Sequence, residues 1–230
     1  MTASRVAWAA AAVLASAMTV ACGYPEAAEP RPESVTDFAA LYGANCSGCH
    51  GAEGRGGVAQ PLNDSLYLAI AGDADLKHVI GRGMPGTPMQ AFAKEAGGML
   101  TPAQVDALVA GLRRTWGGRV EPPNPAVPLP AYAVPEGETG DPGRGRDAYR
   151  TYCARCHGED GRAGTSGAHG SIVDPAFLAL TSDQGLRTTV IAGHARDGMQ
   201  GWRSYVPGHP MQPQEITDVV AWLASHRGAQ

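Results

Sequence analysis

The sequence predicts an all-α protein made of two small helical domains in tandem, joined by a proline-rich linker. Three observations predict this fold class. The two halves of the chain repeat one another, each half ends in an apolar pattern of helical period, and prolines crowd the segment between the halves. We expect a first lobe at residues 34–116, a linker at 117–141 and a second lobe at 142–227.

The duplication becomes visible when residues are paired at a nearly constant offset. Tyr42 and Tyr149 are 107 residues apart, and the segments 64–70 and 174–180 match at an offset of 110. Self-similarity at a fixed spacing is the mark of a repeated structural unit. We therefore expect the two lobes to share one fold.

Each lobe is predicted to open with a helix, from about residue 36 to 44 in the first lobe and from about 145 to 152 in the second. In the first of these helices Phe38, Leu41 and Tyr42 lie at helical spacing, so their side chains share one face. We expect that face to contact the helix that closes the lobe.

The closing helices carry clear start signals. Thr101 as N-cap, Pro102 at the first helical position and Gln104 two residues later form a capping box, and Gln212 with Pro213 opens the second closing helix in the same way. Apolar residues then recur at helical spacing, at Val105, Leu108, Val109, Leu112 and Trp116 and at Ile216, Val219, Val220 and Leu223.

Between the lobes, prolines occur at positions 122, 123, 125, 128, 130, 135 and 142. Proline fixes φ and has no N–H to donate, so such a segment favours an extended, semi-rigid strap over a folded element.

The chemistry of the chain is indicated by a short motif. The pattern Cys-x-x-Cys-His occurs twice, at Cys46, Cys49 and His50 and again at Cys153, Cys156 and His157. Two thiols on one turn can each form a thioether to a haem vinyl group, and the histidine can then bind the iron. Each motif therefore predicts one covalently attached c-type haem.

Other sites also use Cys-x-x-Cys. A thioredoxin-like redox pair does not need a histidine at the next position, and a structural disulfide needs none. A structural zinc site is coordinated by four ligands, whereas each motif supplies three. The double occurrence and the export signal described next favour haem over these alternatives.

The N-terminus reads as a targeting segment. Arg5 gives it a positive charge, and an apolar, alanine-rich run follows from Val6 to Ala21. The run is shorter than the roughly 20 apolar residues that span a bilayer, so residues 1–21 are interpreted as a signal peptide. We expect export from the cytoplasm to the periplasmic side of the cell envelope.

Cys22 is the fifth cysteine and belongs to neither haem motif. The stretch 19–23 resembles a bacterial lipobox, although Thr19 stands where leucine is usual. Lipidation of Cys22 would anchor the chain to a membrane through a tether at residues 22–33. The alternative is cleavage after Ala17, which would leave a soluble periplasmic protein.

Each lobe resembles a class I cytochrome c domain, and the whole chain resembles a bacterial dihaem cytochrome c. The resemblance rests on the two motifs and covers most of the chain after the signal peptide. It implies a small helical fold around one covalent haem in each lobe. Aromatic residues make up only 6% of the chain, so we expect the haem to replace part of each core and haem-free lobes to be unfolded or molten.

In that family the sixth iron ligand is a methionine shortly before the last helix. Met89 and Met199 occupy this place in the two lobes, each followed by glutamine where proline is usual. Met84 and His194 are rivals, since they align with each other and lie five residues before the favoured methionines. A methionine ligand favours reduced iron and raises the potential above that of a bis-histidine site.

The family also has a proline whose backbone carbonyl holds the iron-binding histidine. Pro61 fits this position in the first lobe, whereas Ser171 stands there in the second. Differences around a ligand tune an iron site, so the two haems are expected to differ in potential.

An iron with both axial positions filled has no site for a substrate. The resemblance therefore implies electron transfer in a bacterial respiratory or photosynthetic chain, by a carrier or by a subunit of a membrane quinol oxidoreductase or terminal oxidase. The alternative is a dihaem enzyme of the peroxidase or thiosulfate-oxidising type. The expected partners are redox proteins; the formal net charge is −4 and no basic patch indicates nucleic acid.

Overall fold

The fold is described from a computed structural model, for residues 32–57, 59–118, 128–162, 170–194 and 198–228. The predicted signal peptide, Cys22 and the tether as far as residue 31 lie outside these residues. The first lobe contains α1 (Phe38–Asn45), α2 (Ser47–His50), α3 (Ser65–Ile70), α4 (Asp73–Arg82) and α5 (Pro102–Trp116), with short 3-10 turns at Pro32–Ser34 and Lys94–Ala96. The second contains α6 (Pro142–Tyr152), α7 (Ala154–His157), α8 (Pro175–Ala179), α9 (Asp183–Ala192) and α10 (Pro213–Ala224).

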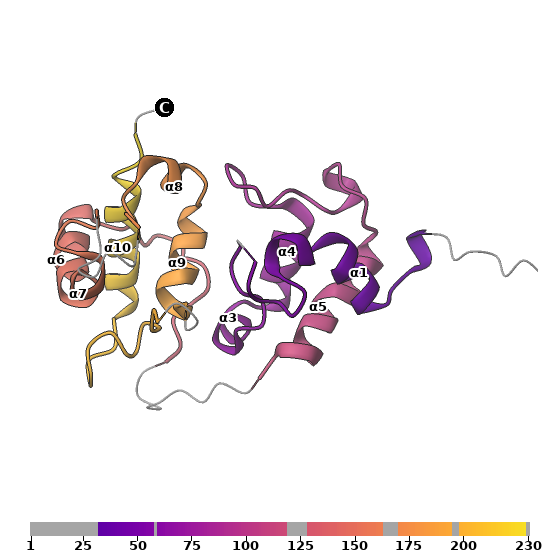
Figure 1. Cartoon of the computed structure of the whole chain (residues 1–230), viewed down its shortest axis with the longest axis horizontal. Helices are drawn as coiled ribbons and strands as arrows, with labels where there is room; N and C mark the ends of the chain where they lie inside the picture. The colour runs from indigo at the N-terminus through magenta and orange to yellow at the C-terminus, as the bar shows by residue number, and fades with distance from the viewer. Residues whose placement is uncertain (1–31, 58, 119–127, 163–169, 195–197, 229–230) are drawn as a thin grey trace, which may run out of the picture. The chain divides into compact units, whose positions relative to one another are not determined.

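The all-α prediction is confirmed. Within the described ranges the backbone forms no β-strand and only two isolated β-bridges. The elements repeat in the same order in the two lobes, from the helix that leads into the Cys-x-x-Cys-His motif to the helix that closes the lobe. In the second lobe α10 contacts both α6 and α9 (Figure 1).

The predicted helix starts are close to the observed ones. The capping box of α5 is confirmed: the Gln104 backbone N–H donates to Thr101 Oγ1 at 3.3 Å, and the Thr101 N–H donates to Gln104 Oε1 at 2.9 Å. Helix α6 begins at Pro142, three residues before the predicted start, because Asp141 accepts a hydrogen bond from the Arg144 N–H. An N-cap acid followed by proline is a helix-start signal in its own right.

In each lobe a glycine lies where the leading helix crosses the closing helix. The glycine belongs to the closing helix in the first lobe and to the leading helix in the second. In the first lobe a Cβ on Gly111 of α5 would lie 2.0 Å from a ring atom of Phe38 on α1. In the second lobe a Cβ on Gly145 of α6 would lie 2.0 Å from the Asp218 carbonyl oxygen and 2.8 Å from Trp222 Cβ, both on α10. At the offsets of the repeat, Gly145 corresponds to Phe38 and Trp222 to Gly111. The large and small residues of the contact have exchanged places.

The aromatic partner of the leading-helix tyrosine differs accordingly. Tyr42 packs edge-on against Trp116 with ring centroids 5.1 Å apart, and Phe38 contacts the same indole. Tyr149 instead packs on Trp222 at 4.2 Å. Both tyrosines are almost fully buried, so each lobe has an aromatic pair at the centre of its helix crossing.

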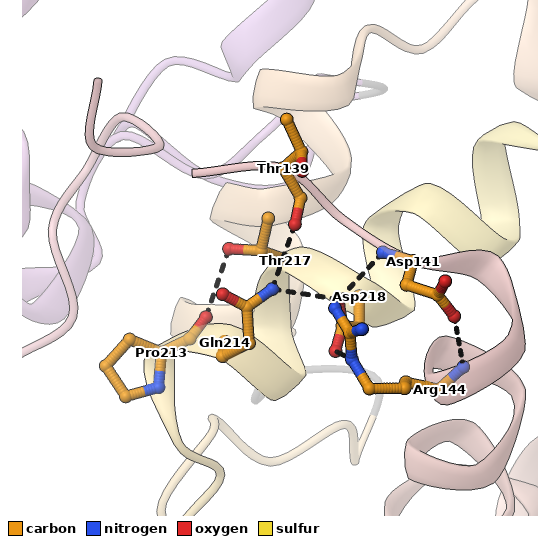
Figure 2. Close-up of polar contacts among 7 residues, drawn as sticks. All are labelled: Thr139, Asp141, Arg144, Pro213, Gln214, Thr217 and Asp218. Carbon is orange, nitrogen blue, oxygen red and sulfur yellow. Dashed lines mark hydrogen bonds and ion pairs between the residues drawn. The ribbon is translucent and has the colours of Figure 1, made fainter. Parts of the chain in front are cut away.

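The second crossing also contains a buried carboxylate. Asp218 on α10 accepts hydrogen bonds from the Asp141 backbone N–H at 2.8 Å, from Arg144 at 2.8 and 2.9 Å, and from Gln214 Nε2 at 2.9 Å (Figure 2). Gln214 also donates to the Thr139 carbonyl. Asp218 thus ties the segment that enters α6 to the start of α10.

The first lobe uses a neutral residue for the same purpose. Gln104, buried on α5, donates from its side-chain amide to the carbonyl oxygens of Pro32 and Val35 at 2.8 and 3.0 Å. Buried polar groups need such partners, since an unsatisfied one costs free energy on folding. In both lobes the entry to the leading helix is held by the first turns of the closing helix.

An arginine of the closing segment secures the middle helices of each lobe. Arg113 pairs with Asp73 and donates to the carbonyl oxygens of Leu68 and Ala71. Arg227 makes the equivalent contacts in the second lobe, with Asp183, Leu178 and Thr181. The partners correspond at an offset of 110, but the two arginines are 114 apart. The two arginines therefore make equivalent contacts in the structure, although they do not align at the offset of the repeat.

The described part of the linker, residues 128–141, is without helix or strand and packs against the protein. The Tyr132 side chain is buried beside Tyr67, with ring centroids 6.4 Å apart. Its carbonyl oxygen accepts hydrogen bonds from Gln184 and from Arg187, which is almost fully buried on α9. This part of the linker is held in place and is not a free strap.

The two lobes contact each other through α3 and α9. Tyr67 on α3 is 6% exposed, and Ile70 packs against the buried residues of both lobes. The corresponding residues of the second lobe are Phe177 in α8 and Leu180 directly after it, and they are 43% and 60% exposed. The contact between the lobes therefore buries residues of the first lobe whose counterparts in the second lobe are exposed. The division into two independently folding domains stays a prediction.

We expect Gly145→Ala to destabilise the second lobe. The new methyl group would overlap the Asp218 carbonyl oxygen, so α6 and α10 would have to separate, at a cost of about 2 kcal/mol in unfolding free energy. Denaturant unfolding of the haem-containing protein measures this. Gly43→Ala is the control, since Gly43 is exposed on α1 with no heavy atom near the added methyl, and it should be neutral or mildly stabilising. Equal effects of the two variants would contradict the close crossing.

We expect the contribution of Asp218 to depend on pH. Burial alone would raise the pKa of Asp218, but the hydrogen bonds from Arg144, Asp141 and Gln214 outweigh it and hold that pKa below its usual range. A depressed carboxyl pKa contributes stability above the unfolded-state pKa of about 4, and this stability is lost as pH falls through the folded-state value. The difference in unfolding free energy between the wild type and Asp218→Asn should therefore shrink from pH 7 towards pH 3. A difference that is constant over this range would contradict the role of the ionised form.

Candidate haem-binding sites

Each Cys-x-x-Cys-His motif begins where the leading helix ends. The Cys46 N–H donates to the Tyr42 carbonyl oxygen at 2.8 Å, which closes the last turn of α1, and the His50 N–H donates to the Cys46 carbonyl oxygen at 3.0 Å. Cys49 lies between them on the single turn of α2. The structure thus brings the two thiols and the imidazole of the first site onto one turn.

The second motif repeats this geometry. The Cys153 N–H donates to the Tyr149 carbonyl oxygen at 2.8 Å, and the His157 N–H donates to the Cys153 carbonyl oxygen at 3.0 Å. Cys156 lies on the same turn, α7. A repeated local geometry of this kind fits one haem for each motif.

In each lobe a tyrosine hydroxyl of the leading helix is hydrogen-bonded to the backbone directly after the motif. Tyr42 Oη donates to the carbonyl oxygen of Gly51 at 2.7 Å, and Tyr149 Oη donates to that of Gly158 at 2.5 Å. Each glycine directly follows the motif histidine. The repeat drew attention to these tyrosines, but a hydroxyl bond to a backbone carbonyl nine residues away has no sequence signal. Tyr42 and Tyr149 therefore help to fix the turn that carries the cysteines and histidine.

The imidazole of His50 is held by a backbone carbonyl, and the expected partner was wrong by one residue. His50 Nδ1 lies 2.8 Å from the carbonyl oxygen of Gln60, which precedes Pro61. A carbonyl can only accept, so the proton is on Nδ1 and Nε2 is left for a metal. Burial lowers the pKa of His50, which favours the neutral form that binds iron, although the bond to Gln60 opposes this shift.

The first cysteine of each motif is the more buried of the two. Burial raises the pKa of the Cys46 thiol to about 11 and that of Cys153 to about 12, so at neutral pH both are uncharged thiols. Cys49 and Cys156 are exposed. Among the described residues no group of three or more His, Cys, Asp or Glu side chains could hold a metal ion. Both thiols and the imidazole lie on one turn in each lobe, which fits the thioether attachment predicted from the motif.

The predicted sixth ligands lie in tight turns after α4 and α9. In the first lobe the Met84 N–H donates to the Met89 carbonyl oxygen at 2.8 Å. In the second lobe His194 and Met199 exchange two backbone hydrogen bonds, at 2.9 and 3.1 Å. Each favoured methionine is thus paired through the backbone with its rival, so the backbone alone does not select between them.

A glycine makes these turns possible. Gly83 and Gly193 have φ of 69° and 76°, in the left-handed region. A Cβ on Gly83 would lie 2.5 Å from the Met89 carbonyl oxygen, and one on Gly193 would lie 2.6 Å from that of Met199. The chain can therefore return close to the end of the preceding helix only with glycine at these positions.

Two buried donors leave room for an acceptor from outside the chain. Trp202 Nε1 and Gln60 Nε2 are buried and have no hydrogen-bond partner among the described residues. A buried N–H without an acceptor is costly. Haem carries carboxylate groups that accept hydrogen bonds, so the surplus donor of Trp202 fits a bound haem in the second lobe. No role for Trp202 was predicted from the sequence.

Comparison with known families agrees with this geometry. The family model described as cytochrome c oxidase, cbb3-type, subunit III matches residues 33–110 and 140–223. The chain belongs to this family. Both matched regions contain one complete Cys-x-x-Cys-His motif, and membership of a cytochrome c family implies covalently bound haem c.

Relatives are found among subunits of respiratory complexes. The chain is 27% identical over 194 residues to the cytochrome bc1 complex cytochrome c subunit of Mycobacterium tuberculosis, covering 79% of this chain and 65% of the relative. It is 30% identical over 129 residues to the cbb3-type cytochrome c oxidase subunit CcoP of Azospirillum, covering 51% of this chain and 37% of that protein. The chain thus spans less than two thirds of the length of these relatives.

Among solved structures, the chain matches the reducing HAO-like protein complex of Kuenenia stuttgartiensis with a TM-score of 0.45 and 18% identity, over 86% of this chain and 99% of that one. Within the described residues no helix is both long and apolar enough to cross a membrane.

Proposed function

We propose that this cytochrome carries two covalent haems, one on each motif, in two cytochrome c domains at residues 34–116 and 142–227. The observation that carries the proposal is the repetition of the whole site: each motif follows a leading helix, lies on one turn and is closed by a tyrosine bond to the next glycine. The family model matches twice, with one motif in each region.

Haem, when bound, supplies an iron that changes between ferrous and ferric states with little change in structure. The chain's own residues hold it: Cys46 and Cys49 in the first site, and Cys153 and Cys156 in the second, form the thioethers. His50 and His157 would each supply one ligand to an iron, and Met89 and Met199 would supply the other. The Gln60 carbonyl orients His50 and makes it a better donor to the metal.

An iron held by both ligands would have no open site for a substrate, so the chemistry that it would supply is the transfer of single electrons. Methionine ligation suits a protein at the oxidising end of a respiratory chain, because the thioether stabilises reduced iron. The relatives are named as subunits of a bc1 complex and a cbb3 oxidase. We infer that this chain transfers electrons between redox proteins of such a chain, either as a carrier or as a complex subunit.

The proposed location is the periplasmic side of the cell envelope, with Cys22 as the lipidated first residue after removal of residues 1–21. The odd number of cysteines supports this, since four of the five belong to the haem motifs. A lipid anchor would keep the haems at the membrane surface where the complexes of electron transport lie.

We expect two low-spin haems per chain. Haem content measured against protein should be two in the wild type and one in either Cys46→Ala/Cys49→Ala or Cys153→Ala/Cys156→Ala. A redox titration should resolve two potentials, because the surroundings of the two sites differ. Carbon monoxide should not bind the reduced protein at either haem. A high-spin haem, or one that binds carbon monoxide, would favour a dihaem enzyme over an electron-transfer protein.

We expect Cys22→Ser to release the protein from membranes. The thiol is the attachment point for the lipid, and serine cannot form the thioether that anchors it. Fractionation of cells that express the two forms, followed by haem staining, measures the membrane-bound share. A variant that stays with the membrane as fully as the wild type would contradict lipidation, and the signal sequence would then serve export alone.

A further inference from the structure

Gln60 contacts the candidate sites of both lobes. Its backbone carbonyl accepts the hydrogen bond from His50 in the first lobe at 2.8 Å. Its side-chain Oε1 lies 3.3 Å from His194 Nε2 in the second lobe, and the Thr189 hydroxyl donates to the same oxygen at 3.4 Å. One residue thus reaches the iron-binding histidine of one site and the rival axial ligand of the other.

His194 lies where it can compete for the second iron. It follows α9 directly after Gly193, and its backbone is paired in both directions with that of Met199. An imidazole is a strong iron ligand, so the His194 side chain would compete with Met199 for the iron unless the protein held it elsewhere. Some feature of the protein has to restrain it if Met199 is the ligand.

The bond to Gln60 restrains the nitrogen that reaches furthest from the backbone. An amide oxygen only accepts, so the contact requires the proton on His194 Nε2, and a protonated nitrogen has no lone pair for a metal. The Thr189 hydroxyl donates to the same oxygen and so favours this orientation of the amide. The remaining nitrogen, Nδ1, lies next to the backbone and has the shorter reach.

The repeat shows why only one lobe needs this restraint. The first lobe has Met84 where the second has His194, so its rival is a weaker base. The position that corresponds to Gln60 at an offset of 110 is Gly170, which has no side chain. The glutamine occurs in the lobe that contains no rival histidine, and its side chain is directed at the histidine of the other lobe.

We propose that Gln60 is a positioning residue that holds the His194 imidazole away from the second iron and so secures Met199 as its ligand. The proposal rests on the two-haem function proposed above. It also makes correct ligation of the second haem depend on contact between the lobes. Replacing the Gln60 side chain leaves its backbone carbonyl in place, so the first haem keeps the support of His50.

The test is Gln60→Leu in the full-length, haem-loaded protein. The leucine cannot accept the His194 proton, so His194 replaces Met199. In the oxidised spectrum we expect loss of about half of the methionine-to-iron charge-transfer absorption, the share of one haem in two. Redox titration should show one potential lowered and the other unchanged, with two low-spin haems still present by electron paramagnetic resonance.

Three further variants make the result specific. His194→Ala alone should keep the full charge-transfer absorption, and the double variant Gln60→Leu/His194→Ala should regain what Gln60→Leu lost. Gln60→Glu retains an acceptor oxygen and should keep both methionine ligands. Full charge-transfer absorption and unchanged potentials in Gln60→Leu would overturn the proposal. So would failure of the double variant to recover, because the loss would then not come from His194.

Failure of the underlying function gives a different pattern. A wild type with one haem, or with methionine absorption from only one haem, fails the two-haem, two-methionine proposal before any substitution is made. If His194→Ala by itself removes a low-spin signal, His194 is the native ligand and the restraint by Gln60 does not exist.

Discussion

In each lobe a single glycine lets the leading helix and the closing helix approach until backbone and side chain touch. The rest of the lobe depends on this crossing, because the Cys-x-x-Cys-His turn begins at the residue where the leading helix ends. Phe38 lies over Gly111 in one lobe, and Trp222 lies over Gly145 in the other. The crossing needs one large residue facing one small residue, and either helix can carry the small one.

Around this contact the two lobes use different chemistry for equivalent tasks. The entry to the leading helix is tied down by the neutral Gln104 in the first lobe and by the ionised Asp218 in the second. Arg113 and Arg227 secure the same carbonyl oxygens from positions almost one helical turn apart along the repeat. Tertiary contacts have thus been kept while the residues that make them have changed, as expected where burial and hydrogen bonding matter more than identity.

The lobes are not equivalent in their surroundings. Helix α3 is covered by the second lobe, whereas the corresponding residues Phe177, in α8, and Leu180, directly after it, are exposed. The linker carbonyl at Tyr132 is bonded to side chains of α9. Gln60 adds polar contacts to His50 in the first lobe and to His194 in the second. Hydrogen bonding and burial around an iron ligand set the potential of its iron, so this asymmetry fits the proposed difference in potential between the two sites.

The sequence by itself determined the helical fold class, the duplication, the capping of α5 and the grouping of each cysteine pair with its histidine. These are local properties, readable from spacing over a few residues. It placed the carbonyl that holds His50 one residue too late, because backbone hydrogen-bond direction within a loop leaves no residue pattern. The exchange of glycine and aromatic residue between the crossing helices, the equivalence of Arg113 with Arg227 and the reach of Gln60 to His194 were decided only by the tertiary structure. Each depends on distances between segments far apart in the chain, and packing, not sequence spacing, sets those distances.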